Sequence, residues 1–157
     1  MQSRNLSLNG TTLIMANLEK LKEVRNAINN FKENFDYRAV KAVKEYVDYS
    51  KKLDSLVKHD CNTCGCIAGF TLALSEHSDS TSITIASRVL ALHNSEKSFL
   101  FFADDVRVGT KNVLPYLRNY DYPKDFYYSK CSNEEGVVEA LRRLDFMIEH
   151  YSKEVPT

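Results

Sequence analysis

The chain contains no long run of apolar residues. A membrane-spanning helix needs about 20 consecutive, mainly apolar residues, and no stretch of the 157 residues approaches that length. Residues 1–14 are polar and lack the apolar centre of a signal peptide. We therefore expect a cytoplasmic protein that does not associate with a membrane and whose cysteines are reduced.

An excess of charge of one sign is also missing. The chain holds 21 Lys and Arg residues against 21 Asp and Glu residues, so its formal net charge is zero. General nucleic-acid binding depends on an excess of basic side chains that contact phosphates. The balance of charges disfavours a general DNA- or RNA-binding function.

Glycine is scarce, with five residues that stand far apart. Loops that hold the phosphates of a nucleotide need several glycines close together, and neither nucleotide-binding signature occurs. The adjacent carboxylates Asp104 and Asp105 are a weak candidate for metal or acid–base chemistry. Neighbouring side chains diverge on a helix or a strand, so we interpret these two as solvated residues at a helix end.

Apolar residues recur at steps of three and four, which is typical of helices with one buried face. This spacing predicts helices over 18–35, 40–56, 67–74 and 83–92. Residues 82–85 also alternate like a strand, but the residues that follow suit a helix better and no partner strand is evident. We expect the 67–74 helix to be buried on several sides, because its residues are apolar or small.

Helix caps complete the fold prediction. Residues 94–96 offer a cap before the apolar run 99–102, and Ser132 followed by Glu135 forms a capping box for the last helix. The buried stripe of that helix is expected to contain Val137, Leu141, Leu144, Ile148 and Tyr151. The sequence thus predicts a mainly α protein: a compact single-domain bundle of about five to six helices over 15–157, with a long Tyr-rich loop. Residues 1–14 are predicted to be a flexible arm, and Met15 is an alternative start residue.

Three of the four cysteines lie within the eight residues from His59 to Cys66. Cys61 and Cys64 have the spacing of half a zinc site, which His59 or Cys66 could extend, but no second pair with ligand spacing occurs. A cysteine nucleophile at a helix N-terminus is another alternative. We favour packed, inert cysteines, and expect neither a cofactor nor a catalytic residue; zinc stays open.

The strongest candidate for ligand or partner binding is the aromatic segment around Pro123. Tyrosines on a proline-containing loop offer a large contact area at low entropic cost, and with a lysine they could stack on a ring. The alternative is that these rings cover the edge of the core. The predicted binding residues are Tyr120, Tyr122, Lys124, Phe126 and Tyr127.

The stretch from Cys61 to Phe70 resembles the signature Cys-Gly-Thr-x-x-Cys-Ile-Ala-Gly-Trp/His of a family of small bacterial and phage proteins. Under this alignment Cys61, Cys66 and Gly69 are the structural motif residues, and Cys64 is an addition. Asn62 stands where the signature has Gly. Later segments occupy the same order as in that family, so the resemblance extends over about 34–151. It implies a helical fold and a bacterial or phage setting, and it implies no particular activity.

Together these features predict a non-catalytic binding protein of bacterial or phage origin. The expected partner is a host protein or a second copy of the chain, and counter-defence or host takeover by a phage would be a natural use. One alternative is a protein that binds a small, nucleotide-like ligand. A cysteine-dependent enzyme and a zinc-stabilised module also stay open, and so does the oligomeric state.

Overall fold

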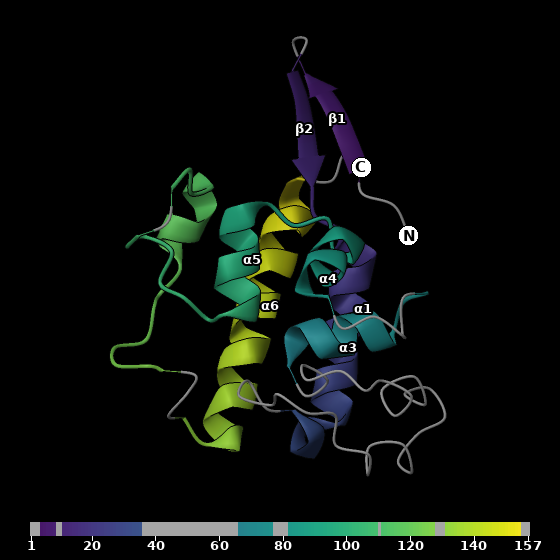
Figure 1. Cartoon of the computed structure of the whole chain (residues 1–157). Coiled ribbons are helices and arrows are strands. Elements are labelled where there is room, and N and C mark those ends of the chain that lie inside the picture. Colours follow the sequence, from purple (N-terminus) through teal and green to yellow (C-terminus); the bar gives the residue numbers. More distant parts are fainter. Residues whose placement is uncertain are drawn as a thin grey trace.

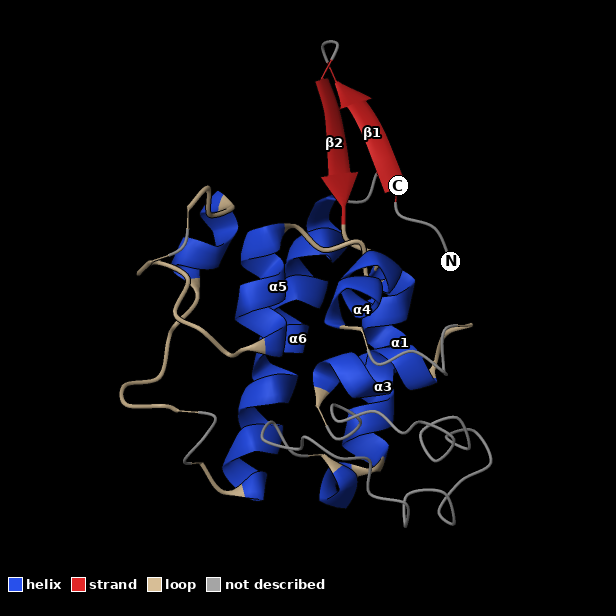
Figure 2. Ribbon diagram, viewed as in Figure 1, coloured by secondary structure: helices blue, strands red, loops and turns tan. Residues whose placement is uncertain are grey.

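The computed structural model describes residues 4–8, 11–35, 66–76, 82–109, 111–127 and 131–154. This part of the chain is mainly helical, as predicted (Figure 2). Its α-helices are α1 (Leu18–Asn30), α3 (Ile67–Ala73), α4 (Ile83–Val89), α5 (Asn94–Phe101) and α6 (Asn133–Glu154). Two short 3₁₀ helices are η1 (Lys32–Asn34) and η4 (Pro115–Asn119). The helix predicted over 40–56 lies outside the described residues.

The helical body is organised around α6, the longest helix, which packs against both α1 and α5 (Figure 1). Helices α1 and α6 run antiparallel, since Arg25 pairs with Asp145 midway along them and Tyr151 lies near Ala16 at the start of α1. Helix α3 packs against α1 and α4. Residues of α1 and α6 with no exposed surface form the centre of the core: Leu21, Val24, Ile28, Ala140, Leu144 and Met147.

The predicted capping box of α6 is confirmed. The Ser132 hydroxyl accepts the Glu135 amide at 3.1 Å, and the Glu135 carboxylate accepts the Ser132 amide at 2.9 Å. Helix α4 confirms the choice of helix over strand, and it begins with Ser82, whose hydroxyl accepts the Ile85 amide. These side chains satisfy amides that have no partner within the first turn of a helix.

Predicted helix boundaries differ from those observed at α1, α5 and α4, the last of which ends at Val89 instead of 92. Helix α1 ends at Asn30 instead of continuing to 35, because Phe31 leaves helical geometry with φ −131°; Asn30 and its neighbour Asn29 are weak helix formers. Helix α5 is capped by His93, one residue before the predicted cap. The His93 ring accepts the Ser95 amide, and the carboxylate of Glu96 accepts the His93 amide at 2.9 Å.

Helix α3 is buried on every side, as its small and apolar residues predict. Cys66 forms its N-cap, and Gly69 lies within it. At its other end the Lys20 ammonium donates to the Leu74 carbonyl at 2.8 Å. A cation at this end of a helix satisfies a carbonyl that has no partner in the helix.

A β-hairpin that the sequence interpretation did not predict includes residues of the predicted arm 1–14; the flexibility of that arm stays a prediction. Strands β1 (Arg4–Leu8) and β2 (Thr11–Met15) pair antiparallel, with Leu8 opposite Thr11. This hairpin projects from one end of the helical body (Figure 1). The overlooked signal is Asn-Gly between two apolar-containing runs, which is the strongest short-range indication of a hairpin.

None of the helices in the described ranges combines the length and the apolar character that crossing a membrane requires.

Candidate recognition cleft

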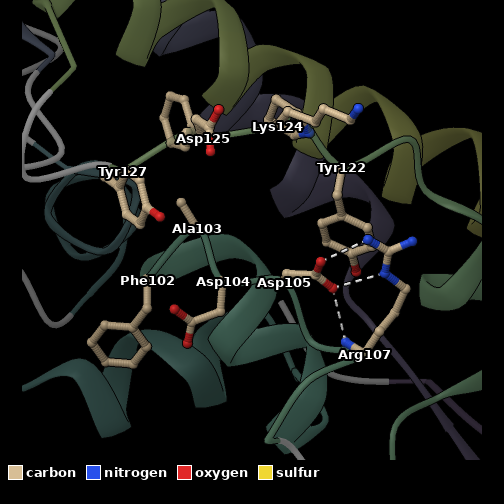
Figure 3. Close-up of a pocket in the computed structure, with 11 residues that line it drawn as sticks. Phe102, Ala103, Asp104, Asp105, Arg107, Tyr122, Lys124, Asp125 and Tyr127 are labelled. Carbon is tan, nitrogen blue, oxygen red and sulfur yellow. Dashed lines mark hydrogen bonds and ion pairs between the residues drawn. The ribbon is translucent and has the colours of Figure 1, made fainter.

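A hollow of about 420 Å³ lies between the segment that follows α5 and the segment that precedes α6. Figure 3 shows Phe102, Asp104 and Asp105 on one wall, with Lys124, Asp125 and Tyr127 on the other. We call this hollow the cleft. Its lining consists of Phe102, Ala103, Asp104, Asp105, Arg107, Tyr122, Pro123, Lys124, Asp125, Phe126 and Tyr127.

The first wall is formed by a sharp turn at the end of α5. Ala103 adopts a left-handed backbone conformation with φ 52°, which costs a non-glycine residue about 1–2 kcal/mol. The turn is held by the Asp104 amide, which donates to the Ser98 carbonyl at 3.1 Å. The Asp104 carbonyl in turn accepts a hydrogen bond from Arg143 at 2.8 Å. The position of this wall is therefore fixed by bonds from two helices.

Arg143 connects the two walls from beneath. Its side chain is buried, and its Nε donates to the Glu139 carboxylate at 2.7 Å. The guanidinium also lies 5.4 Å from the ring centroid of Tyr122 in the second wall. The buried Arg143 guanidinium thus donates to the Asp104 carbonyl of the first wall and lies near the Tyr122 ring of the second wall.

The second wall is formed by the aromatic segment before α6. Tyr120 lies behind this wall in the core, and its hydroxyl donates to Glu139 at 2.7 Å. Tyr122 is half-buried and donates to the Leu117 carbonyl at 2.8 Å. Burial raises the pKa of Tyr122 to about 12, so this hydroxyl stays protonated at neutral pH. Both tyrosines hold the wall in place from within.

One end of the cleft is closed by Arg107. Its guanidinium binds both carboxylate oxygens of Asp105, at 2.8 and 2.7 Å, and lies 4.6 Å from the ring centroid of Tyr122 (Figure 3). Hydrogen bonds from Arg107 hold the pKa of Asp105 below its usual range. The Asp105 carboxylate is therefore ionised and fully engaged.

The other end of the cleft is open and carries Asp104, Lys124 and Tyr127. The Tyr127 side chain is 57% exposed. The Asp104 carboxylate forms no hydrogen bond or ion pair with any residue that the structure describes, and burial raises its pKa, opposed by the charge of Arg143. The Lys124 amino group lies away from this carboxylate (Figure 3). The lining at the open end thus includes a carboxylate and aromatic side chains.

Four of the five residues predicted for binding line the cleft: Tyr122, Lys124, Phe126 and Tyr127. Tyr120 does not, because its ring packs in the core. The predicted long loop also begins with the 3₁₀ helix η4 instead of irregular chain. The sequence interpretation missed the opposing wall from α5.

The carboxylates of that wall were visible in the sequence as Asp104-Asp105. They lie just beyond a helix end, as predicted, but nothing in the sequence indicates that this end faces the aromatic segment some twenty residues later. The structure gives the two carboxylates different environments, because only that of Asp105 contacts a guanidinium among the described residues.

Of the predicted zinc ligands, only Cys66 is among the described residues. It is buried at the start of α3, and Cys131 is buried before α6. No group of three or more His, Cys, Asp or Glu side chains that could hold a metal occurs in the described ranges. His59, Cys61 and Cys64 lie outside those ranges, so the zinc alternative stays a prediction.

Neither described histidine is among the residues that line the cleft. Nucleophilic catalysis needs a nucleophile within hydrogen-bonding reach of a base. His93 caps α5, and the His150 ring stacks on Tyr116 with centroids 3.7 Å apart. The groups that do line it are carboxylates, cations and aromatic rings, which suit recognition.

No family model matches the chain, and comparisons with curated proteins and with solved structures also found no match.

Proposed function

We propose that this chain is a non-catalytic binding protein that holds a segment of another protein in the cleft. The observation that supports this most strongly is the convergence of the predicted aromatic segment with the end of α5 around one hollow. Each wall turns at a residue with positive φ, 52° at Ala103 and 58° at Asp125, as the chain also does at Ala91 and Asn112 outside the cleft.

The surroundings of the cleft favour a protein partner. Three large apolar side chains are well exposed in the described part of the chain, and two of them belong to this region: Tyr127 lines the cleft, and Val108, 75% exposed, directly follows Arg107. Exposed apolar side chains beside polar groups are typical of protein interaction sites. The partner proposed is a host protein in a bacterial or phage setting, with counter-defence or host takeover as the role, on the basis of the family resemblance.

A small-molecule ligand is the second candidate. The volume of about 420 Å³ lies within the range of ligand pockets, which runs from about 300 to 1,000 Å³. Such a ligand would stack on Tyr127, and Lys124 or Asp104 would set the charge that it must carry. A cysteine-dependent enzyme or a zinc-stabilised module would instead depend on residues 59–66 and would not require the cleft.

Replacement of Tyr127 by Ala tests the proposal. An aromatic anchor at an interface contributes about 2 kcal/mol or more, so we expect Tyr127→Ala to weaken partner binding by about thirtyfold or more. The measurement is affinity capture of partners from bacterial cells with quantitative mass spectrometry, followed by titration of the captured partner. Because Tyr127 is exposed, the melting temperature should stay within a few degrees of the wild-type value.

Val138→Ala is the matched control, because Val138 is also exposed, at 61%, but lies on α6 away from the cleft lining. It should leave partner capture unchanged. Identical partner sets for the wild-type protein and both variants would contradict the proposal. Size-exclusion chromatography of each variant would show whether the partner is a second copy of the chain.

A further inference from the structure

We propose that the open end of the cleft binds an arginine side chain of the partner protein, with Asp104 as its counter-ion. This inference rests on the proposed function and specifies the chemistry that the cleft recognises. The residues proposed to contact the arginine side chain are Asp104, Phe102 and Tyr127. The proposed site does not require Arg107 or Asp105, which satisfy each other at the closed end.

The charges of the cleft favour a cation. Its lining holds three carboxylates against two basic side chains, an excess of one negative charge. Asp105 is neutralised by Arg107, while the carboxylate of Asp104 has no cation in contact among the described residues. Lys124 does not supply one, because its amino group lies away from Asp104 (Figure 3). A cation that makes direct contact with a carboxylate stabilises its charged form.

The chain itself shows how guanidinium groups bind in this region. Arg107 contacts the Asp105 carboxylate and lies over the ring of Tyr122. Arg142 contacts the Glu139 carboxylate and lies 4.7 Å from the ring centroid of Tyr120.

Arg143 repeats the arrangement a third time. It binds Glu139 and lies 4.7 Å from the ring centroid of Phe99. Each guanidinium thus contacts a carboxylate, which Arg142 and Arg143 share, and lies over at least one aromatic ring; Arg143 lies over three. The open end supplies the same two components, Asp104 and the aromatic rings of Phe102 and Tyr127.

Arginine fits these components better than lysine does. Its guanidinium is planar, stacks on aromatic rings and donates two parallel hydrogen bonds to one carboxylate. A lysine ammonium is a compact and strongly hydrated charge that forms neither arrangement as well. The cleft should therefore bind an arginine side chain more tightly than a lysine side chain, and more tightly than a neutral side chain.

The test uses the full chain, labelled with ¹⁵N, and acetylated Gly-X-Gly amide peptides in which X is arginine, citrulline, lysine, leucine or glutamate. Citrulline matches arginine in shape but carries no charge. We expect the arginine peptide to shift the backbone amides of Asp104 and Tyr127, with an affinity at least several times that of the citrulline and lysine peptides. Asp104→Asn should lower the arginine affinity to that of citrulline.

Glu149→Gln is the control for Asp104→Asn, because it also removes one exposed carboxylate but lies on α6 outside the cleft lining. It should leave the arginine affinity unchanged. Equal affinity for arginine and citrulline, or no effect of Asp104→Asn, would overturn the inference. Free arginine binding as tightly as the peptide would assign the site to a small cation and would also overturn it.

The two proposals can fail separately. A leucine or glutamate peptide that binds best at the cleft would refute the role of arginine but leave the cleft as a protein-binding site. If no peptide shifts a cleft amide, the arginine inference fails, and the dependence of partner capture on Tyr127 decides the proposed function by itself.

Discussion

Charged and polar side chains buried beneath the cleft set the positions of its walls. Glu139 accepts hydrogen bonds from Tyr120, Arg142 and Arg143, at 2.7 Å each. A buried carboxylate with three donors is well satisfied, and the loss of one charged donor leaves it undercompensated. The residues of this cluster therefore affect both the stability of the fold and the shape of the cleft.

A second buried cluster surrounds Glu96 on α5. Tyr116 donates to its carboxylate at 2.5 Å, and Tyr151 donates to the same oxygen. The Ser95 hydroxyl of the same turn accepts the Leu114 amide at 3.2 Å. These bonds fasten the segment containing η4 to α5 and α6, so that the aromatic segment following η4 begins from a fixed point.

Arg143→Met should destabilise the protein strongly. The substitution keeps much of the apolar volume but removes the bonds to Glu139, Phe99 and Asp104. Breaking a buried ion pair typically costs about 3–5 kcal/mol. Urea unfolding followed by circular dichroism measures this change. Lys153→Met removes an exposed cation of the same helix and should change stability little; equal effects of the two variants would show that Arg143 has no special role.

At the level of the elements, side-chain caps determine where several helices begin. Ser132 and Glu135 do this for α6, Ser82 for α4, and His93 with Glu96 for α5. Each cap satisfies a backbone amide of the first helical turn. The caps thus fix the residue at which each of these helices begins.

Ser132→Ala tests the contribution of the cap of α6. The loss of an N-cap hydroxyl typically costs about 1 kcal/mol, and we expect the midpoint of urea unfolding to fall accordingly without a change in slope. Ser152→Ala is the matched control, since Ser152 is exposed near the end of the same helix and alanine favours a helix interior. It should leave stability unchanged or raise it slightly. A similar loss in both variants would rule out a specific capping effect.

At the scale of the whole molecule, the burial of tyrosines makes the free energy of unfolding depend on pH in the alkaline range. Burial raises the pKa of Tyr116, Tyr120 and Tyr151, and the negative charges of Glu96 and Glu139 add to the effect. Their hydroxyls stay protonated in the folded state, whereas in the unfolded chain they ionise near pH 10. The folded state therefore holds more protons than the unfolded state above this pH, and its stability must fall.

We expect the free energy of unfolding to be insensitive to these tyrosines below about pH 9 and to decrease above about pH 10. Tyr122, whose pKa is about 12, adds a fourth group protonated only when folded, so the slope should approach about 5 kcal/mol per pH unit between about pH 10 and 12. Urea unfolding at a series of pH values measures it, and near-ultraviolet absorbance of tyrosinate shows whether ionisation accompanies unfolding. Tyr151→Phe should reduce the slope by about one quarter; an unchanged slope would contradict this assignment.

Local sequence patterns predicted much of the helical structure. The spacing of apolar residues indicated α1, α3, α4 and α6, and the pair Ser132 and Glu135 indicated the start of α6. These signals depend on interactions within one or two helical turns, so a single sequence contains them. The Asn-Gly signal for the hairpin was also local, but it was overlooked beside the helical stripe that starts at Leu18.

The roles of the tyrosines and of the carboxylates after α5 were decided by the tertiary structure alone. Tyr120 and Tyr127 lie in the same aromatic segment of the sequence, yet one is buried against Glu139 and the other is 57% exposed. Asp104 and Asp105 are neighbours, and only the Asp105 carboxylate contacts a guanidinium among the described residues. Sequence determined which segments form helices, because those contacts are local. Which side chains meet around the cleft depends on how α5 and α6 pack, and packing joins residues that are distant in the chain.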